Sequence, residues 1–442
     1  MKEKRYLLKK GIWLYFLLLI FEGALRKWFL PSLAAPILVI RDPLALWIIL
    51  FANEKGMFPK TSFVIWMVFI GIISLFTALF FGHGNLQIAV YGARILLIHF
   101  PLIFAIGKIL NRNDVLRIGK LVVWLSLPMT LLIALQFYSP QTAWVNRTVG
   151  GIIEENGFQG ANGHFRPSAT FSFITGTYLY YGLATCFILY FWFNTNLINK
   201  FLLITSTTCL LAAIPLSISR TLFFEVGISI AFFCVAASLK SRYFGKMLVT
   251  VGIGMVTLIL LSKTSFFQHT TDTFFDRFTS ANKTEGGLEG VLGDRFLGGL
   301  ISAISNSGRL PFFGYGIGMG TNVGSQFFSG GRRFLLHEEE WGRIIDEQGP
   351  LLGQAVVFIR VALATRLTIG SYNRLTKGDM LPWMLLSFGF LAVAQGNWSQ
   401  PTSLGFCTLI GGLIIAAFRE PLPATLKQAL VSNVEKSLFR AQ

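Results

Sequence analysis

Two arginines stand at predicted turns between apolar segments, where a charged side chain is able to do chemistry. Arg166 lies in GHFRPSATFSF and Arg220 in LSISRTLFFEV, and we expect both guanidinium groups near the lipid headgroups of one membrane face. A guanidinium group stays charged and directs several N–H donors at phosphate oxygens, so the two can bind a lipid-linked phosphate or diphosphate. Contact with ordinary lipid headgroups is the alternative interpretation.

A candidate general base lies farther along the chain, where His337 is followed by Glu338 and two more glutamates. An imidazole or a carboxylate held opposite the two arginines is able to take the proton of an attacking hydroxyl group. An acidic run just before a helix also has a purely structural role, since it complements the helix dipole. The sequence leaves both roles open.

Glycines are dense in the stretch GRLPFFGYGIGMGTNVG, which runs from Gly308 to Gly324 and includes Gly314, Gly316 and Gly318. The stretch follows no predicted strand and opens no predicted helix, so it is not a dinucleotide-binding fingerprint. Such a turn lets backbone amides approach a ligand closely, and it equally allows tight packing of the loop.

Several charged residues fall within apolar segments, where charge is costly and often functional. They are Glu22, Arg26, Arg41, Asp42, Arg94 and Glu225. Glu22 and Arg26 are spaced i, i+4 and can meet on one helix face, whereas the adjacent Arg41 and Asp42 need partners on other helices. These charges form either a polar network that ties helices together or the lining of a wet cavity.

The composition identifies the elements that must position these residues. Of 442 residues, 53% are hydrophobic and 13% are charged, and the mean hydropathy is +0.61, which indicates a membrane protein. The net charge of +17 is scattered between apolar segments, which does not favour nucleic-acid binding. The four cysteines lie in apolar segments without metal-ligand spacing, so we expect inert core residues.

We therefore predict an all-α, polytopic membrane helix bundle that forms one integral domain over residues 1–442, with about 12 spans. The predicted spans are 11–30, 33–52, 62–82, 87–110, 118–138, 171–193, 200–218, 221–239, 247–262, 343–365, 380–395 and 402–418. No small-residue cleavage site follows the first apolar run, so we expect an uncleaved first helix.

Lysines and arginines concentrate in alternate connections, which by the positive-inside rule puts both termini in the cytoplasm. Two connections on the opposite face are long, namely a first external loop over 139–170 and a large external loop over 263–342. Asp294 to Ser307 in the large loop have the apolar spacing of an amphipathic helix lying on the membrane surface. We expect the chemistry on this outer face.

Several familiar site motifs are missing from the sequence. It contains no HExxH, no P-loop, no CxxC pair and no GxSxG, which argues against a zinc protease, a nucleotide-driven pump and a serine hydrolase. We predict no bound metal and no cofactor.

The ordered motifs resemble those of the O-antigen ligase and O-antigen polymerase superfamily, membrane glycosyltransferases of the GT-C type. The similarity covers roughly residues 120–420 and is loose. Its motifs here are Arg166 with Thr170 and Phe171, Ser219 with Arg220, Arg295 leading an amphipathic stretch, and Pro311 with Gly314, Gly316 and Gly318. In the family a His then precedes a Gly-x-x-Gly helix start by a fixed spacing. Counting back from Gly349 places Glu338 at that position, with His337 one residue early, and the second glycine is displaced to Gly353.

The resemblance implies a metal-independent, inverting transfer of a glycan from an undecaprenyl diphosphate carrier onto the hydroxyl of a glycan, lipid or protein, in the bacterial cytoplasmic membrane. Arg166, Arg220, and Arg295 or Arg309, would stabilise the departing diphosphate. His337 or Glu338 would be the base, with Arg343 and Asp346 as supporting residues. The product would be an O-antigen or an exopolysaccharide, and polymerase is favoured over ligase.

Two other classes of function remain open on the sequence. A transporter or flippase of lipid-linked sugars would use the intramembrane charges as a path, although no internal repeat is visible and the large loop is awkward for alternating access. A non-catalytic component of a polysaccharide export system would explain the displaced histidine.

Overall fold

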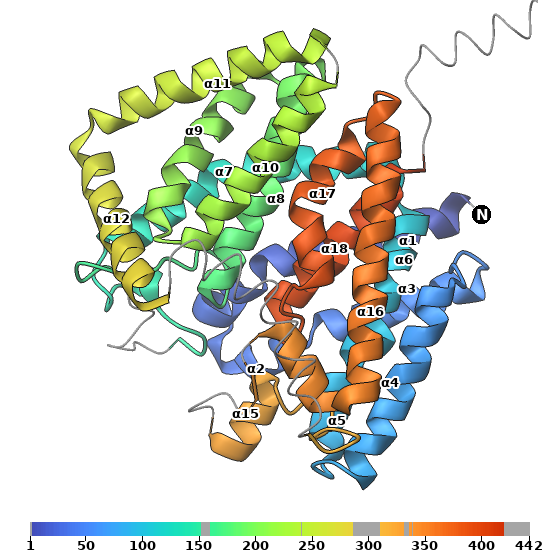
Figure 1. Ribbon diagram of the computed structural model, residues 1–442. Coiled ribbons are helices and arrows are strands. Elements are labelled where there is room, and N and C mark those ends of the chain that lie inside the picture. Colours follow the sequence, from blue (N-terminus) through green and yellow to red (C-terminus); the bar gives the residue numbers. More distant parts are fainter. Residues whose placement is uncertain are drawn as a thin grey trace, which may run out of the picture.

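Helices make up the regular secondary structure of the computed structural model (Figure 1). The structure describes residues 2–151, 160–239, 241–285, 310–330, 336–337 and 339–419. No β-strand occurs in these ranges. Eight of the described helical segments are long and apolar enough to cross a membrane, and three further apolar helices are shorter. The predicted all-α class is confirmed for the described residues, with eight candidate membrane spans where about 12 were predicted.

The N-terminal half contains seven α-helices, with two π-helical turns and one 3-10 turn between them. They are α1 (Lys2–Ala24), the π turn Leu25–Phe29, the 3-10 turn Pro31–Leu33, α2 (Ala34–Leu38), α3 (Arg41–Glu54), α4 (Ser62–Phe80), α5 (Leu86–Arg94), the π turn Ile95–His99, α6 (Phe100–Ile109) and α7 (Arg112–Tyr138).

The helices described in the C-terminal half follow the first long connection, which contains the 3-10 turn Trp144–Asn146. They are α8 (Ile174–Phe193), α9 (Lys200–Leu216), α10 (Arg220–Ser238), α11 (Ser241–Ser262), α12 (Ser265–Glu285), α15 (Asn322–Ser329), α16 (Glu340–Thr376), α17 (Leu381–Ala394) and α18 (Pro401–Ala417).

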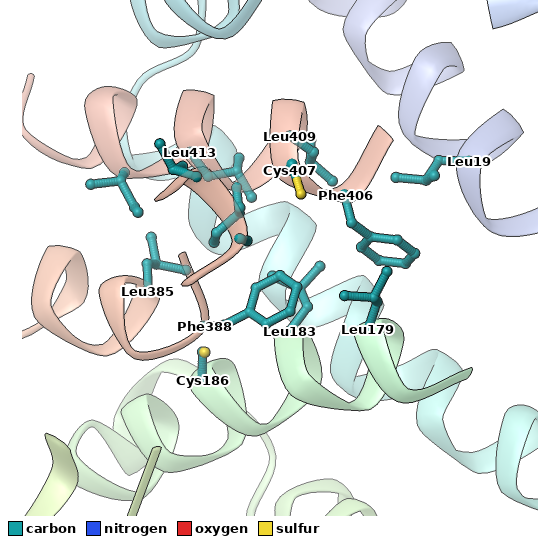
Figure 2. Packing of buried hydrophobic residues seen from close by; sticks show 14 of the residues in the cluster. Leu19, Leu179, Leu183, Cys186, Leu385, Phe388, Phe406, Cys407, Leu409 and Leu413 are labelled. Carbon is teal, nitrogen blue, oxygen red and sulfur yellow. The ribbon is translucent and has the colours of Figure 1, made fainter. Parts of the chain in front are cut away.

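Helix α8 lies at the centre of the bundle and α11 lies at its edge. In the most apolar window of α8, 94% of residues are buried, against 6% for α11. Figure 2 shows the core beside α8, where Leu183 and Cys186 face Leu385 and Phe388 of α17 and Cys407 of α18. Because α8 is apolar on every side, it needs neighbours all round, whereas α11 exposes its apolar side chains.

Three predicted spans are interrupted. The span predicted at 33–52 breaks at Val39 and Ile40. Arg41 and Asp42 lie in the first turn of α3, near the middle of the candidate span Pro31–Glu54. The span predicted at 87–110 contains the π turn Ile95–His99. The span predicted at 343–365 is the longer helix α16, which passes through a non-helical Gly349 with φ of 77°. Gly349 followed by Pro350 explains that break.

The long connection predicted over 263–342 contains helical structure. Helix α12 occupies its start, and α15 follows the glycine-rich stretch. The amphipathic helix predicted for Asp294 to Ser307 lies outside the described residues.

All four cysteines are free. Cys186 and Cys407 are buried, as predicted, but Cys209 is only partly buried and Cys234 is exposed. The prediction of four core cysteines is therefore wrong for Cys234, because α10 turns that side chain away from the bundle.

Candidate functional site

The buried charges of the first helices pair with one another. Arg41 Nε donates to Glu22 Oε2 at 2.7 Å, and its second terminal nitrogen donates to the Pro401 carbonyl oxygen at 2.7 Å. Arg26 lies 3.7 Å from Glu22, so the predicted i, i+4 pair is present but is the longer contact. This cluster joins α1 and α3 to the start of α18.

A second cluster centres on Asp42. Arg94 donates to both carboxylate oxygens at 2.8 and 2.7 Å, and His99 Nε2 lies 2.8 Å from Oδ1. The π turn Ile95–His99 begins directly after Arg94, and its extra residue brings both side chains round to the same carboxylate. Arg41 and Asp42 thus have partners on other helices, as predicted.

The glycine-rich loop is held by its own packing against neighbouring backbone. Tyr315 N–H donates to the Asp346 carbonyl at 2.8 Å, and Gly316 N–H donates to the Glu347 carbonyl at 2.9 Å. Gly318 has φ of +94°, and a Cβ there would lie 2.1 Å from the Ile88 carbonyl oxygen. Close packing therefore accounts for the glycines Gly314, Gly316 and Gly318 without a ligand.

A buried ion network lies beneath that loop, on α16. Arg343 donates to Glu340 at 3.0 Å and to Glu347 at 2.6 Å, and Arg360 donates to the other oxygen of Glu340 at 2.5 Å. Glu347 also accepts a hydrogen bond from Gly320 N–H at 2.8 Å. The predicted supporting residue Arg343 thus stabilises the loop and α16. Sequence reasoning missed Glu347 and Arg360, whose only signal was charge inside an apolar helix.

His337 and Asp346 form a hydrogen-bonded pair at an open pocket. His337 Nδ1 lies 2.6 Å from Asp346 Oδ2; the imidazole side chain is 64% exposed, and the aspartate is 8% exposed. Tyr315 and Met319 of the glycine-rich loop line the same pocket of about 530 Å³. Because the carboxylate accepts the Nδ1 proton, Nε2 is left to accept a proton from a ligand.

Three of the predicted site residues are not among the residues that the structure describes. Glu338, Arg295 and Arg309 lie outside the described residues. The structure therefore describes one of the two candidate bases, His337.

A cationic pocket of about 210 Å³ lies beside the first long connection, lined by Lys27, Arg147 and Arg166. Lys27 is 1% exposed and donates to Ser168 Oγ at 3.0 Å and to the Ala169 carbonyl at 2.6 Å. Arg147 Nε is buried without a hydrogen-bond partner among the described residues. None of the described lining residues is acidic, so the pocket favours an anion.

Lys27 and Arg147 were not predicted from the sequence. Lys27 occupies the π turn Leu25–Phe29, which carries it inward beneath the connection. The one available signal was a lysine inside the apolar run FEGALRKWFLP. Arg147 stood in the first external loop predicted over 139–170, and no recognised motif surrounds it.

Arg220 begins α10, whose first turn is capped by the Ser219 hydroxyl group. Arg220 does not line the cationic pocket, but Ile218, two residues before it, lies near Arg166 with Gly160 beside both. A Cβ on Gly160 would lie 2.7 Å from Ile218 Cδ1 and 3.5 Å from Arg166 Cγ. The two predicted arginine segments are thus neighbours in space.

A third cavity of about 780 Å³ adjoins the cationic pocket. It shares Val149 and Ser172 with the cationic pocket, and it is also lined by Asn322 and Gln326 of α15. Helix α15 directly follows the loop that carries Met319 into the His337 pocket. Helices α2 and α15, which both line this cavity, are drawn near each other in the lower part of Figure 1.

The described residues include no group of three or more His, Cys, Asp or Glu side chains able to hold a metal ion. The arrangement instead offers fixed cations and one oriented imidazole. No protein family model, curated protein or solved structure matches the chain.

Proposed function

We propose that this protein is a membrane glycosyltransferase that transfers or polymerises a glycan from an undecaprenyl diphosphate carrier. The acceptor is a hydroxyl group of a glycan, lipid or protein at the outer face of the bacterial cytoplasmic membrane. The observation that carries the proposal is the cationic pocket of Lys27, Arg147 and Arg166. It shares two lining residues with a cavity at α15, the helix that directly follows the loop at the His337 pocket.

The chemistry assigns a role to each group. The acceptor oxygen attacks the anomeric carbon with inversion, and the bond to the diphosphate oxygen breaks with its electron pair. Lys27, Arg147 and Arg166 stabilise the charge that develops on the diphosphate. His337 Nε2 takes the acceptor proton, and Asp346 orients the ring and stabilises the resulting imidazolium.

The proposal includes the topology of the chain. Twelve spans with both termini in the cytoplasm leave the connections 139–170 and 263–342 on the outer face. Eight long apolar helices and the concentration of basic residues in alternate connections support this arrangement.

Most of the buried charges that a transporter path would use are paired. Arg41, Asp42 and Arg94 are engaged with other side chains, and none of them lines the three cavities described above. Glu225 Oε2 is buried without a hydrogen-bond partner among the described residues, but Glu225 lines none of these cavities either. A non-catalytic role would leave the oriented imidazole without a purpose.

The test uses the purified protein with the lipid-linked oligosaccharides of its own host, in EDTA. We expect glycan transfer by the wild type and by Arg117→Gln, whose side chain is 74% exposed and remote from the site. We expect loss of transfer in Arg147→Gln, Arg166→Gln and His337→Ala. Absence of product with the wild type, or full activity in His337→Ala, contradicts the proposal.

A further inference from the structure

The cavity of about 780 Å³ has the lining of a carbohydrate site. Three residues with side-chain amides line it, namely Asn322 and Gln326 on α15 and Gln400 just before α18. Asn322 and Gln326 are spaced i, i+4, so they present their amides from one face of the helix. The volume lies within the range of about 300–1,000 Å³ typical of small-molecule sites.

The chemistry of these groups matches sugar hydroxyls. An amide both donates and accepts hydrogen bonds, as a hydroxyl group does, so each amide is able to pair with a ring hydroxyl in either sense. Phe173 and Phe327 add apolar surface for the C–H faces of a sugar ring. No described lining residue is acidic, and the guanidinium of Arg26 already donates to Ser172 Oγ at 2.9 Å and to the Ala34 carbonyl at 2.8 Å. The cavity therefore suits a neutral, polar ligand.

Its position agrees with this chemistry. Val149 and Ser172 line both this cavity and the cationic pocket, so a group attached to an anion in the pocket enters the cavity directly. In the donor, the sugar is the group attached to the diphosphate. The far side of the cavity, at α15, adjoins the loop that reaches His337.

We infer that the cavity lined by Asn322, Gln326 and Gln400 binds the sugar units next to the diphosphate of the donor. The inference rests on the proposed function and deepens it by naming the donor glycan subsite. The isoprenoid tail then leaves the cationic pocket by another route.

The experiment measures binding of two probes to the full-length protein in lipid nanodiscs. The probes are bare undecaprenyl diphosphate and the undecaprenyl diphosphate-linked glycans extracted from the host. The test variant is Asn322→Ala/Gln326→Ala, in which both replaced side chains are exposed. Gln400→Ala provides a second variant, and Gln87→Ala, an exposed amide outside the cavity, is the matched control.

We expect the double variant to bind the lipid-linked glycan about tenfold more weakly, as for two lost hydrogen bonds, and to bind the bare lipid unchanged. Gln400→Ala also weakens binding of the lipid-linked glycan relative to the bare lipid, and Gln87→Ala leaves both affinities unchanged. Equal weakening of both probes means that the cavity holds the lipid tail and overturns the inference, as does unchanged binding of both. If the wild type binds neither probe, the proposed function itself fails.

Discussion

Asp346 accepts two hydrogen bonds from His337, one from the imidazole Nδ1 at 2.6 Å and one from the backbone N–H at 3.3 Å. The double contact ties the segment before α16 to the second turn of that helix. It also fixes which ring nitrogen is engaged, since Nδ1 contacts the carboxylate and His337 lines the open pocket. The imidazole is thus tethered to α16 while its side chain stays 64% exposed, as the proposed base requires.

The His337–Asp346 pair predicts different losses of kcat for two variants, one that removes the proposed base and one that removes the group orienting it. His337→Ala lowers kcat about 100-fold to 10,000-fold, because a positioned base contributes that much. Asp346→Asn lowers kcat less than removal of the imidazole, since the base remains but its preferred tautomer is lost. Rates of glycan transfer at saturating donor measure both effects. Equal activity of Asp346→Asn and the wild type contradicts an orienting role.

The cationic pocket predicts that Arg147 contributes to donor binding. Arg147→Gln removes a charged donor and weakens binding of undecaprenyl diphosphate about tenfold to 100-fold, as for one charge-assisted hydrogen bond. Arg147→Lys recovers part of the affinity, because it restores the charge without the planar fork. Binding of the bare lipid is the measurement, with Arg117→Gln as the control. Equal binding by Arg147→Gln and the control excludes Arg147 from the site.

The Asp42–Arg94 pair predicts a stability effect and not an effect on transfer. Asp42→Asn leaves Arg94 and His99 facing a neutral group, which costs about 3–5 kcal/mol for a buried pair. The double variant Asp42→Asn/Arg94→Gln loses less than the sum of the single variants, because the pair acts as a unit. Thermal unfolding in detergent measures the cycle. Additive losses of unfolding free energy would show that the two side chains do not act as a pair. Normal stability with lost glycan transfer would show that the pair has a functional role instead.

The glycine-rich loop predicts opposite outcomes for two glycine replacements. Gly318→Ala destabilises the protein by about 1–3 kcal/mol from backbone strain alone, and the contact with Ile88 adds to this. Gly227→Ala in α10 meets no atom within 4 Å and stabilises the helix by about 0.5–1 kcal/mol. Unfolding midpoints test both. A neutral Gly318→Ala would leave room for a ligand-binding role of the loop.

The topology predicts which engineered cysteines react from outside the cell. In a variant whose exposed Cys234 is replaced by serine, a cysteine at Gln87 reacts with a membrane-impermeant maleimide and a cysteine at Lys60 does not. Both native side chains are exposed, so access and not burial decides the result. Labelling at Lys60 in intact cells, with none at Gln87, would reverse the proposed orientation.

Much of the fold was predictable because apolar length decides membrane spanning. A long apolar run must satisfy its backbone hydrogen bonds within itself, and a helix does so regardless of the rest of the chain. The breaks were less predictable. The helix breaks at Val39–Ile40 and Ile95–His99 adjoin buried charges that pair with other helices, and these partners are not visible in the sequence. A π turn also does not change the hydropathy of an apolar segment.

For the candidate site too, some residues could be predicted from the sequence and others only from the tertiary structure. Residue type alone marked Arg166, Arg220, His337 and Asp346 as able to do chemistry, because charge or imidazole beside apolar helices has few roles. Only the tertiary structure brought Lys27 and Arg147 to Arg166, paired Asp346 with His337, and assigned Arg343 to a buried ion network. These choices depend on contacts between segments far apart in the chain. Hydropathy and spacing describe each segment by itself, so they determine that helices form but not which side chains meet between them.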